Sequence, residues 1–197
     1  MKYLFFLSIT LFSIQISAET AVYFTPSLDC ENQIIRLLNN SKKSIDISVY
    51  SINNNNIVAA LKEAHARGVP IRILTDRVQA AGRSAKSIEL YESGLNIRVH
   101  SKHRIEHNKF MVSDNEAVIT GSYNWTNPAS LKNSENCLVV WNDDDTVLKY
   151  KKRFEYLWDV NSAEKSDAWF ARKIAENKQK SLSFEKTSPI SKEEGGR

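Results

Sequence analysis

Short apolar segments alternate along the chain with segments of helical periodicity, and this order constrains the fold more than any other feature of the sequence. In residues 45–49, apolar and polar side chains alternate, which is typical of a strand with one buried face. Residues 57–67 carry apolar side chains at helical spacing and end at Gly68, a common residue after a helix. Strands that alternate with helices favour a mixed, largely parallel sheet with helices on both faces. The sequence therefore predicts an α/β domain.

The same reasoning assigns the remaining elements. The predicted strands comprise residues 21–25, 45–49, 71–75, 97–99, 109–113, 117–120 and 137–141. The predicted helices comprise residues 31–39, 57–67, 84–93 and 143–158, with a short final helix at 163–176. Because the turn-forming Asp114, Asn115 and Glu116 separate the strands 109–113 and 117–120, these two are expected to form a β-hairpin, which adds an antiparallel part to the sheet.

This hairpin carries a cluster of polar residues whose spacing suits chemistry at phosphorus. His107 and Lys109 are two residues apart, so in an extended strand their side chains point to the same side. The hairpin then returns residues 121–124 to the neighbourhood of His107. An imidazole, a cation and an amide donor on one surface fit a phosphodiester, whose transition state spreads negative charge over oxygens that such donors stabilise. We expect Gly121 to let the backbone come close to the phosphate.

The spacing of these residues is specific. The pattern is His107-x-Lys109-x4-Asp114-x6-Gly121-Ser122-x-Asn124, and it would occur by chance roughly once in 10^7 to 10^8 starting positions at ordinary residue frequencies. It resembles the HKD motif of the phospholipase D superfamily, and the resemblance continues through residues 133–136 and covers nearly the whole domain. The nearest branch is the single-motif one, which contains exported bacterial endonucleases and mitochondrial cardiolipin hydrolase.

The resemblance implies a reaction through a phosphohistidine. In-line displacement places the attacking atom and the leaving oxygen on opposite sides of phosphorus, so one histidine cannot both attack and protonate the leaving group. Larger phospholipases D carry two motifs, whereas this chain has one. The resemblance therefore implies a homodimer in which two copies of His107 meet at a two-fold axis, one as nucleophile and one as acid and later base.

The resemblance gives the other motif residues supporting roles. Lys109 and Asn124 are expected to hold the phosphate oxygens. Glu135 is expected to accept a hydrogen bond from the far imidazole nitrogen and so fix its tautomer. Ser122 is expected to contact the phosphate or support the residues that do, and Asp114 to organise the hairpin and its charges.

These expectations lead to three functional hypotheses. The first is a metal-independent phosphodiesterase that acts as a non-specific endonuclease on DNA or RNA and needs no cofactor. The second is a phospholipase D that hydrolyses phospholipid head groups with the same residues, where Trp125, Trp141 or the C-terminal segment would provide a peripheral membrane contact. The third is a nucleic-acid-binding module that has lost catalysis, against which the intact motif argues.

Other uses of histidine are less consistent with the sequence. His103 and His107 are four apart, as zinc ligands on a helix can be, but their segment is polar and irregular and has no cysteine nearby. His65, His100 and His103 are expected to be structural or exposed. Composition does not exclude a Ser-His-Asp triad, although the chain has no Gly-x-Ser-x-Gly elbow. No metal site is expected.

Residues 1–18 have the features of a secretory signal peptide. They carry one basic residue, Lys2, then an apolar stretch of about fourteen residues, which is short of the roughly twenty needed to span a bilayer. We therefore expect an exported protein, periplasmic or secreted, with a catalytic domain at 19–162 and a short helix and flexible charged tail at 163–197. Retention of residues 1–18 as an anchor stays open.

Cysteine content and charge add two further points. Cys30 and Cys137 either form one disulfide in an exported chain or remain buried free thiols, and the sequence leaves both open. The net charge of +4 falls to +3 when Lys2 is removed with the leader. This mild surplus favours anionic substrates such as nucleic acid or acidic lipid.

Overall fold

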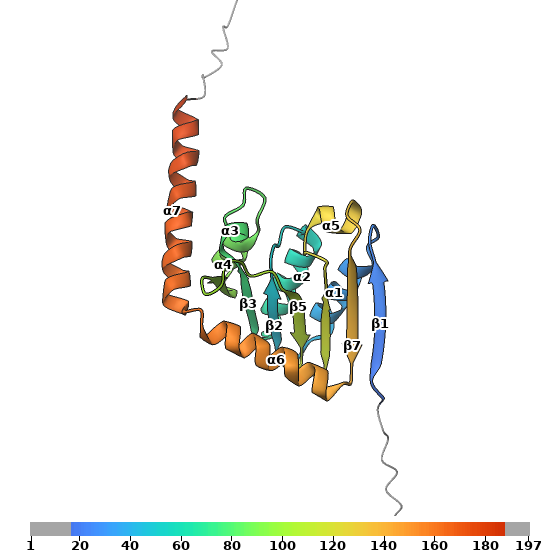
Figure 1. The fold of residues 1–197 in the computed structure, drawn as a ribbon. Coiled ribbons are helices and arrows are strands. Elements are labelled where there is room, and N and C mark those ends of the chain that lie inside the picture. Colours follow the sequence, from blue (N-terminus) through green and yellow to red (C-terminus); the bar gives the residue numbers. More distant parts are fainter. Residues whose placement is uncertain (1–16, 188–197) are drawn as a thin grey trace, which may run out of the picture.

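The computed structural model describes residues 17–187, which fold around one seven-stranded sheet with helices on both faces (Figure 1). The strands are β1 (Glu19–Phe24), β2 (Ile45–Val49), β3 (Ile71–Asp76), β4 (Asn96–His100), β5 (Lys109–Ser113), β6 (Ala117–Gly121) and β7 (Asn136–Trp141). Their order across the sheet is β1-β7-β6-β5-β2-β3-β4. All seven predicted strands are present, with small differences at their ends.

The sheet is mixed, as predicted, but its parallel part is limited to two pairs. Strands β2, β3 and β4 run parallel, whereas the pairs β1–β7, β7–β6, β6–β5 and β5–β2 are antiparallel. The predicted hairpin, β5 and β6, lies at the centre and joins the parallel half to the antiparallel half. Alternation of strands and helices therefore holds for the first half of the chain and not for the second.

The helices are α1 (Asp29–Asn40), α2 (Asn55–Ala66), α3 (Arg77–Ala80), α4 (Ser87–Glu92), α5 (Asn127–Leu131), α6 (Asp144–Asp159) and α7 (Ala163–Thr187). The larger core cluster joins one face of the sheet to α1, α2, α4 and the start of α7. A smaller cluster joins the other face to α6, through Phe110, Val118, Phe154 and Leu157 among others. Two polar side chains cap long helices at their first turns. Asn54 accepts hydrogen bonds from two backbone N–H groups at the start of α2, and Asp143 accepts one from the backbone N–H of Thr146 in α6.

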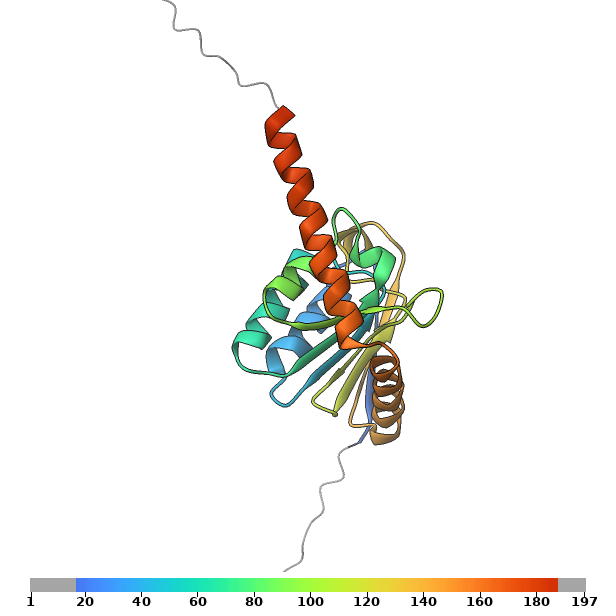
Figure 2. The same ribbon diagram turned by 90° about the vertical axis from the view of Figure 1, so that its left-hand side faces the viewer.

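Helix α7 is longer than the sequence pattern suggested. Trp169 and Phe170 anchor its first half in the core, but the helix continues to Thr187 and projects away from the domain (Figures 1 and 2). The prediction of a helix that ends at Glu176, followed by a flexible tail from Asn177, is therefore wrong up to Thr187. No glycine or proline occurs between residues 163 and 187, so a polar composition there does not interrupt the helix.

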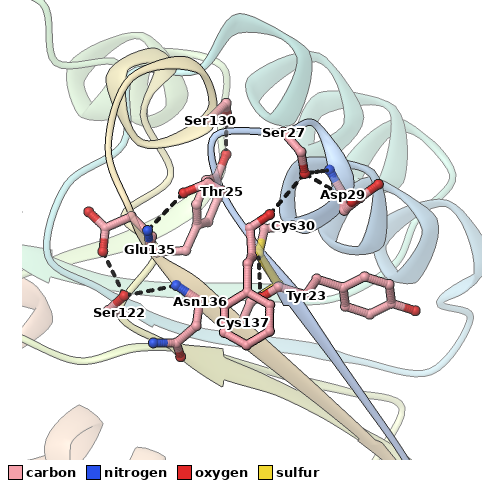
Figure 3. The surroundings of a disulfide bond; sticks show 12 residues. Tyr23, Thr25, Ser27, Asp29, Cys30, Ser122, Ser130, Glu135, Asn136 and Cys137 are labelled. Atoms are coloured by element: carbon pink, nitrogen blue, oxygen red, sulfur yellow. Dashed lines mark hydrogen bonds between the residues drawn. A yellow bond between two sulfur atoms is a disulfide. The ribbon is translucent and has the colours of Figure 1, made fainter.

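A disulfide between Cys30 and Cys137 ties the start of α1 to β7, next to the edge strand β1 (Figure 3). The two cysteines are 107 residues apart in the sequence. Of the two alternatives that the sequence left open, the structure has the disulfide.

The expected signal peptide lies almost entirely outside the described residues, as do residues 188–197. Within residues 17–187, no helix combines the length and apolar character that a membrane crossing requires.

Candidate active site

The motif residues gather at one edge of the sheet because antiparallel pairing brings the right strand ends together. β5 begins at Lys109, β6 ends at Gly121 and β7 begins at Asn136, all at the upper edge in Figure 1. On the other side of β5, Val49 at the end of β2 pairs with Lys109. One edge therefore presents residues from four segments that are distant in sequence.

His107 and Lys109 differ sharply in exposure. The His107 side chain is exposed, whereas Lys109 is 7% exposed. The Lys109 ammonium donates a hydrogen bond of 2.6 Å to the backbone oxygen of His107. Burial lowers the pKa of Lys109, and the nearby carboxylates of Glu135 and Glu106 partly oppose this effect. The pair thus combines an accessible histidine side chain with a nearly buried positive charge that binds the histidine backbone.

Tyr50, which sequence reasoning did not single out, contacts both of these residues. Its ring lies edge-on to the His107 ring, with centroids 4.7 Å apart, and its centroid is 5.0 Å from the Lys109 ammonium nitrogen. Its backbone N–H donates to the oxygen of Asn108, and its hydroxyl accepts from Gln79 of α3. A tyrosine directly after a buried strand gives no local signal of this role, since its partner strand β5 lies far along the chain.

Glu106 is a second residue that the sequence did not indicate, and it fixes the loop that delivers His107. It is 1% exposed, and its Oε1 accepts hydrogen bonds from the Ser48 hydroxyl and from the backbone and side chain of Asn108. Its own N–H donates to Asp76 at the end of β3. Contacts on both sides of His107 therefore hold this irregular segment in place.

Ser122 and Glu135 face each other across the ends of β6 and β7 (Figure 3). The Ser122 hydroxyl donates to Glu135 Oε2 at 2.6 Å and accepts from the Asn136 N–H at 3.1 Å. Thr25, just after β1, exchanges two hydrogen bonds with the backbone of Glu135. The Glu135 carboxylate also accepts from Asn133. Its hydrogen bonds among the described residues come from Ser122 and Asn133 and not from His107.

Gly121 has a structural role that the sequence did not predict. Its φ is +151°, and an added Cβ would collide with the backbone oxygen of Asn136 and crowd the Cα of Cys137. The glycine thus allows β6 to approach β7. Asn124 lies in the loop that follows, half-buried, and its Oδ1 is one of the few buried polar atoms without a hydrogen-bond partner within residues 17–187.

Asp114 lies at the opposite end of β5 from Lys109, so the structure does not bring it to the other motif residues. It adopts a positive φ of 55° in the hairpin turn, and its carboxylate accepts from the backbone N–H groups of Lys42, Lys43 and Ser44. Partial burial raises its pKa, but the three backbone donors outweigh this and hold the pKa below its ordinary value. Asp114 therefore connects the hairpin to the loop before β2, in line with the organising role suggested for it.

The other three histidines differ in exposure. His100 is buried and its Nε2 accepts from the backbone N–H of His103, whereas the His65 and His103 side chains are exposed. Within residues 17–187, no group of three or more histidine, cysteine or acidic side chains is arranged to hold a metal ion.

Trp125 is 2% exposed and Trp141 packs against the core. The suggested interfacial role of Trp125 is therefore wrong.

Comparison with known proteins connects this edge to a family. Residues 34–158 match the family described as "Cardiolipin synthase, PLD-like domain". A protein named phospholipase D from Rickettsia prowazekii is 33% identical over 154 residues, which is 78% of this chain and 67% of that protein. A mitochondrial cardiolipin hydrolase from Chlamydomonas reinhardtii is 29% identical over 129 residues, which is 66% of this chain and 57% of the relative.

Two solved structures have a similar fold. Nuc from Salmonella typhimurium, described as a phospholipase D family member, superposes with a TM-score of 0.71 at 29% identity and covers 74% of this chain and 97% of its own. NucT from Helicobacter pylori has a TM-score of 0.68 at 22% identity, covers 74% of this chain and 98% of its own, and supports the same fold. With a family match over most of the domain, the motif at its expected strand ends and the shared fold, the chain belongs to the phospholipase D family.

Proposed function

We propose that this protein is a metal-independent phosphodiesterase that acts as a non-specific endonuclease on DNA or RNA, with His107 as nucleophile. The observation that carries the proposal is the exposed side chain of His107 beside the nearly buried Lys109, whose ammonium donates to the His107 backbone oxygen. This arrangement offers a nucleophile to solvent and keeps a fixed positive charge beside it, where the negative charge of the transition state develops. The half-buried side-chain amide of Asn124, in the loop after β6, carries N–H donors from which a phosphate oxygen would accept.

The proposed reaction has two steps. An imidazole nitrogen of His107 forms a bond to phosphorus while the bond to the leaving oxygen breaks, and that oxygen takes a proton from the second histidine. Water then attacks the phosphohistidine and gives its proton to the same second histidine, which releases His107. Lys109 and Asn124 would hold the phosphate oxygens during both steps.

The second histidine is proposed to be His107 of another copy of the chain. His65 and His103 are exposed and lie in no Lys-containing motif, and both ring nitrogens of the buried His100 contact other protein groups. The edge beside the site also exposes apolar side chains that a second copy would cover: Phe24 is 66% exposed and Leu131 is 61% exposed. These features support a homodimer with a shared site.

Exchange of the nucleophile tests the function. We expect His107→Ala to abolish turnover of single-stranded DNA, duplex DNA and RNA in the presence of a chelator, by at least about 10^3-fold, because the covalent step is lost. His103→Ala, which removes an exposed imidazole from the same loop, is the matched control and should retain activity. Near-normal turnover by the purified His107 variant, or loss of wild-type activity with chelator and recovery with one metal, would contradict the proposal.

A mixed dimer tests the shared site. A heterodimer of one wild-type and one His107→Ala chain lacks either the attacking or the protonating group in each orientation, so it should be strongly impaired. Half of the wild-type activity in the heterodimer, or full activity in a confirmed monomer, would show that each chain works alone.

Lys109→Ala should lower the turnover rate roughly 10^2- to 10^3-fold, by analogy with the loss of one oxyanion donor.

Phospholipase D activity is the second candidate, because two of the relatives are named for phospholipid hydrolysis. Phospholipid vesicles therefore belong in the same assay, and preferential head-group release would favour this alternative.

We also propose that the protein acts outside the cytosol. The leader-like residues 1–18 and the Cys30–Cys137 disulfide support this, since disulfides persist in oxidising compartments. Fractionation of cells that express the full chain tests the location.

A further inference from the structure

Helix α7 lies outside the matched family region, which ends at residue 158, and it is rich in cationic side chains. Its first half packs on β4 and α4, whereas every residue from 177 to 183 is exposed. This exposed half projects beyond the upper edge of the sheet (Figures 1 and 2). The packing of the domain therefore does not account for it.

Two clefts beside α7 are lined by cations. The first, of about 580 Å³, lies between α7 and the loop after α3, and its charged lining residues are Arg83, Lys173 and Lys180. The second, of about 280 Å³, lies near the start of α7, and its charged lining residues are Arg77, Lys165 and Arg172. No aspartate or glutamate lines either cleft. Each cleft thus offers a concave surface of one sign of charge.

Most of these cations take part in no ion pair within residues 17–187. Lys173 and Arg172 both pair with Glu176. The other ion pairs within residues 17–187 involve none of Arg77, Arg83, Lys165 and Lys180. Lys180 also lowers the pKa of the Glu176 carboxyl, so Glu176 partly offsets its charge. The remaining surplus of positive charge attracts polyanions.

The first cleft is connected to the candidate active site through α3. The Tyr50 ring that contacts His107 carries the hydroxyl that accepts from Gln79, and the backbone oxygen of Gln79 accepts from the N–H of Gly82. Gly82 and Arg83 line the cleft directly. The Arg83 side of this cleft is therefore linked through α3 to Tyr50 and so to the candidate active site.

We propose that the Arg83–Lys180 cleft binds backbone phosphates of the nucleic-acid substrate away from the scissile bond; this inference rests on the proposed endonuclease function. Phosphate contacts hold a strand without reading its sequence, which suits a non-specific nuclease. The chemistry of α7 favours nucleic acid over a membrane. Between residues 177 and 183, Leu182 is the one large apolar side chain, whereas a helix that lies in a membrane surface presents a whole apolar face.

Binding measurements in the His107→Ala background test this site without cleavage. The test variant adds Arg83→Gln and Lys180→Gln. The matched control adds Lys42→Gln and Lys152→Gln, which remove the same charge from exposed positions before β2 and on α6. A fluorescent single-stranded DNA long enough to extend from His107 to Lys180 is titrated at several salt concentrations, and thermal melting confirms that all proteins fold.

We expect the test variant to bind DNA more weakly and with a smaller salt dependence than the control. Affinity changes with salt to a power of about 0.7 to 0.9 per phosphate contact, so two lost contacts should lower it roughly 25- to 60-fold at about 0.1 M salt. Equal DNA binding by test variant and control would overturn the inference. A loss of binding to vesicles that contain anionic phospholipid, without a loss of binding to DNA, would overturn it too. Wild-type turnover is measured alongside: if the wild type fails to cleave nucleic acid, the proposed function fails whatever the binding result.

Discussion

Removal of the Cys30–Cys137 disulfide should destabilise the domain by far more than the loss of either sulfur atom from the core. The bond closes a loop between residues 107 apart. In the chain-entropy treatment, a loop of this length stabilises the folded state by about 4.8 kcal/mol at about 25 °C, and measured values commonly fall at about 2 to 5 kcal/mol. Both cysteines are buried, at 0% and 2% exposure, so each Cys→Ala change adds a packing loss of about 1 kcal/mol.

Urea unfolding of four proteins separates these contributions: the wild type, Cys30→Ala, Cys137→Ala and the double variant. Each single variant breaks the same bond, so each should lose most of the stabilisation, and the double variant should lose about 1 kcal/mol more. With a urea dependence of about 2 kcal/mol per molar, the single changes should lower the midpoint by about 2 M. Reductant should produce a similar shift in the wild type and none in the variants.

Two results would refute this reasoning. If the free-energy losses of the single variants summed to that of the double variant, the two cysteines would not be coupled. If thiol titration of the native wild type found two free thiols and reductant left its midpoint unchanged, the cysteines would be the buried free thiols that the sequence left open.

Two further changes test the hairpin. Asp114→Asn should lower stability by about 1 to 2 kcal/mol at neutral pH, because an amide replaces the carboxylate that accepts three backbone N–H bonds. Since the folded-state pKa of Asp114 is depressed, its stabilisation is present above the unfolded pKa and lost as the pH falls through the folded value, so urea midpoints should converge in acid. Gly121→Ala should cost at least about 1 to 3 kcal/mol and reduce activity, because the added Cβ meets the backbone beside Glu135. Gly68→Ala, also at a positive φ but with no atom within 4 Å of the Cβ, is its control, and equal losses in the two would disprove the contact.

The sequence by itself determined the elements and most of the motif. Alternation and helical spacing located all seven strands and the main helices, because both patterns depend on local geometry. The motif spacing also placed His107, Lys109 and Ser122 at one sheet edge, because a short hairpin turn fixes how its two strands return. Local composition did not determine how far α7 extends. The same polar and charged residues occur in exposed helices and in flexible tails.

Tertiary structure decided what depends on contacts between distant segments. β1 joins the antiparallel edge beside β7, which brings Thr25 to Glu135 and Cys30 to Cys137. Tyr50 and Glu106 reach the candidate site through strand order and burial, and neither has a local pattern that reveals it. Gly121 is required by the approach of β7, which no spacing within the motif encodes. The physical reason is the same in each case: strand pairing and side-chain packing act across the fold, whereas periodicity acts along the chain.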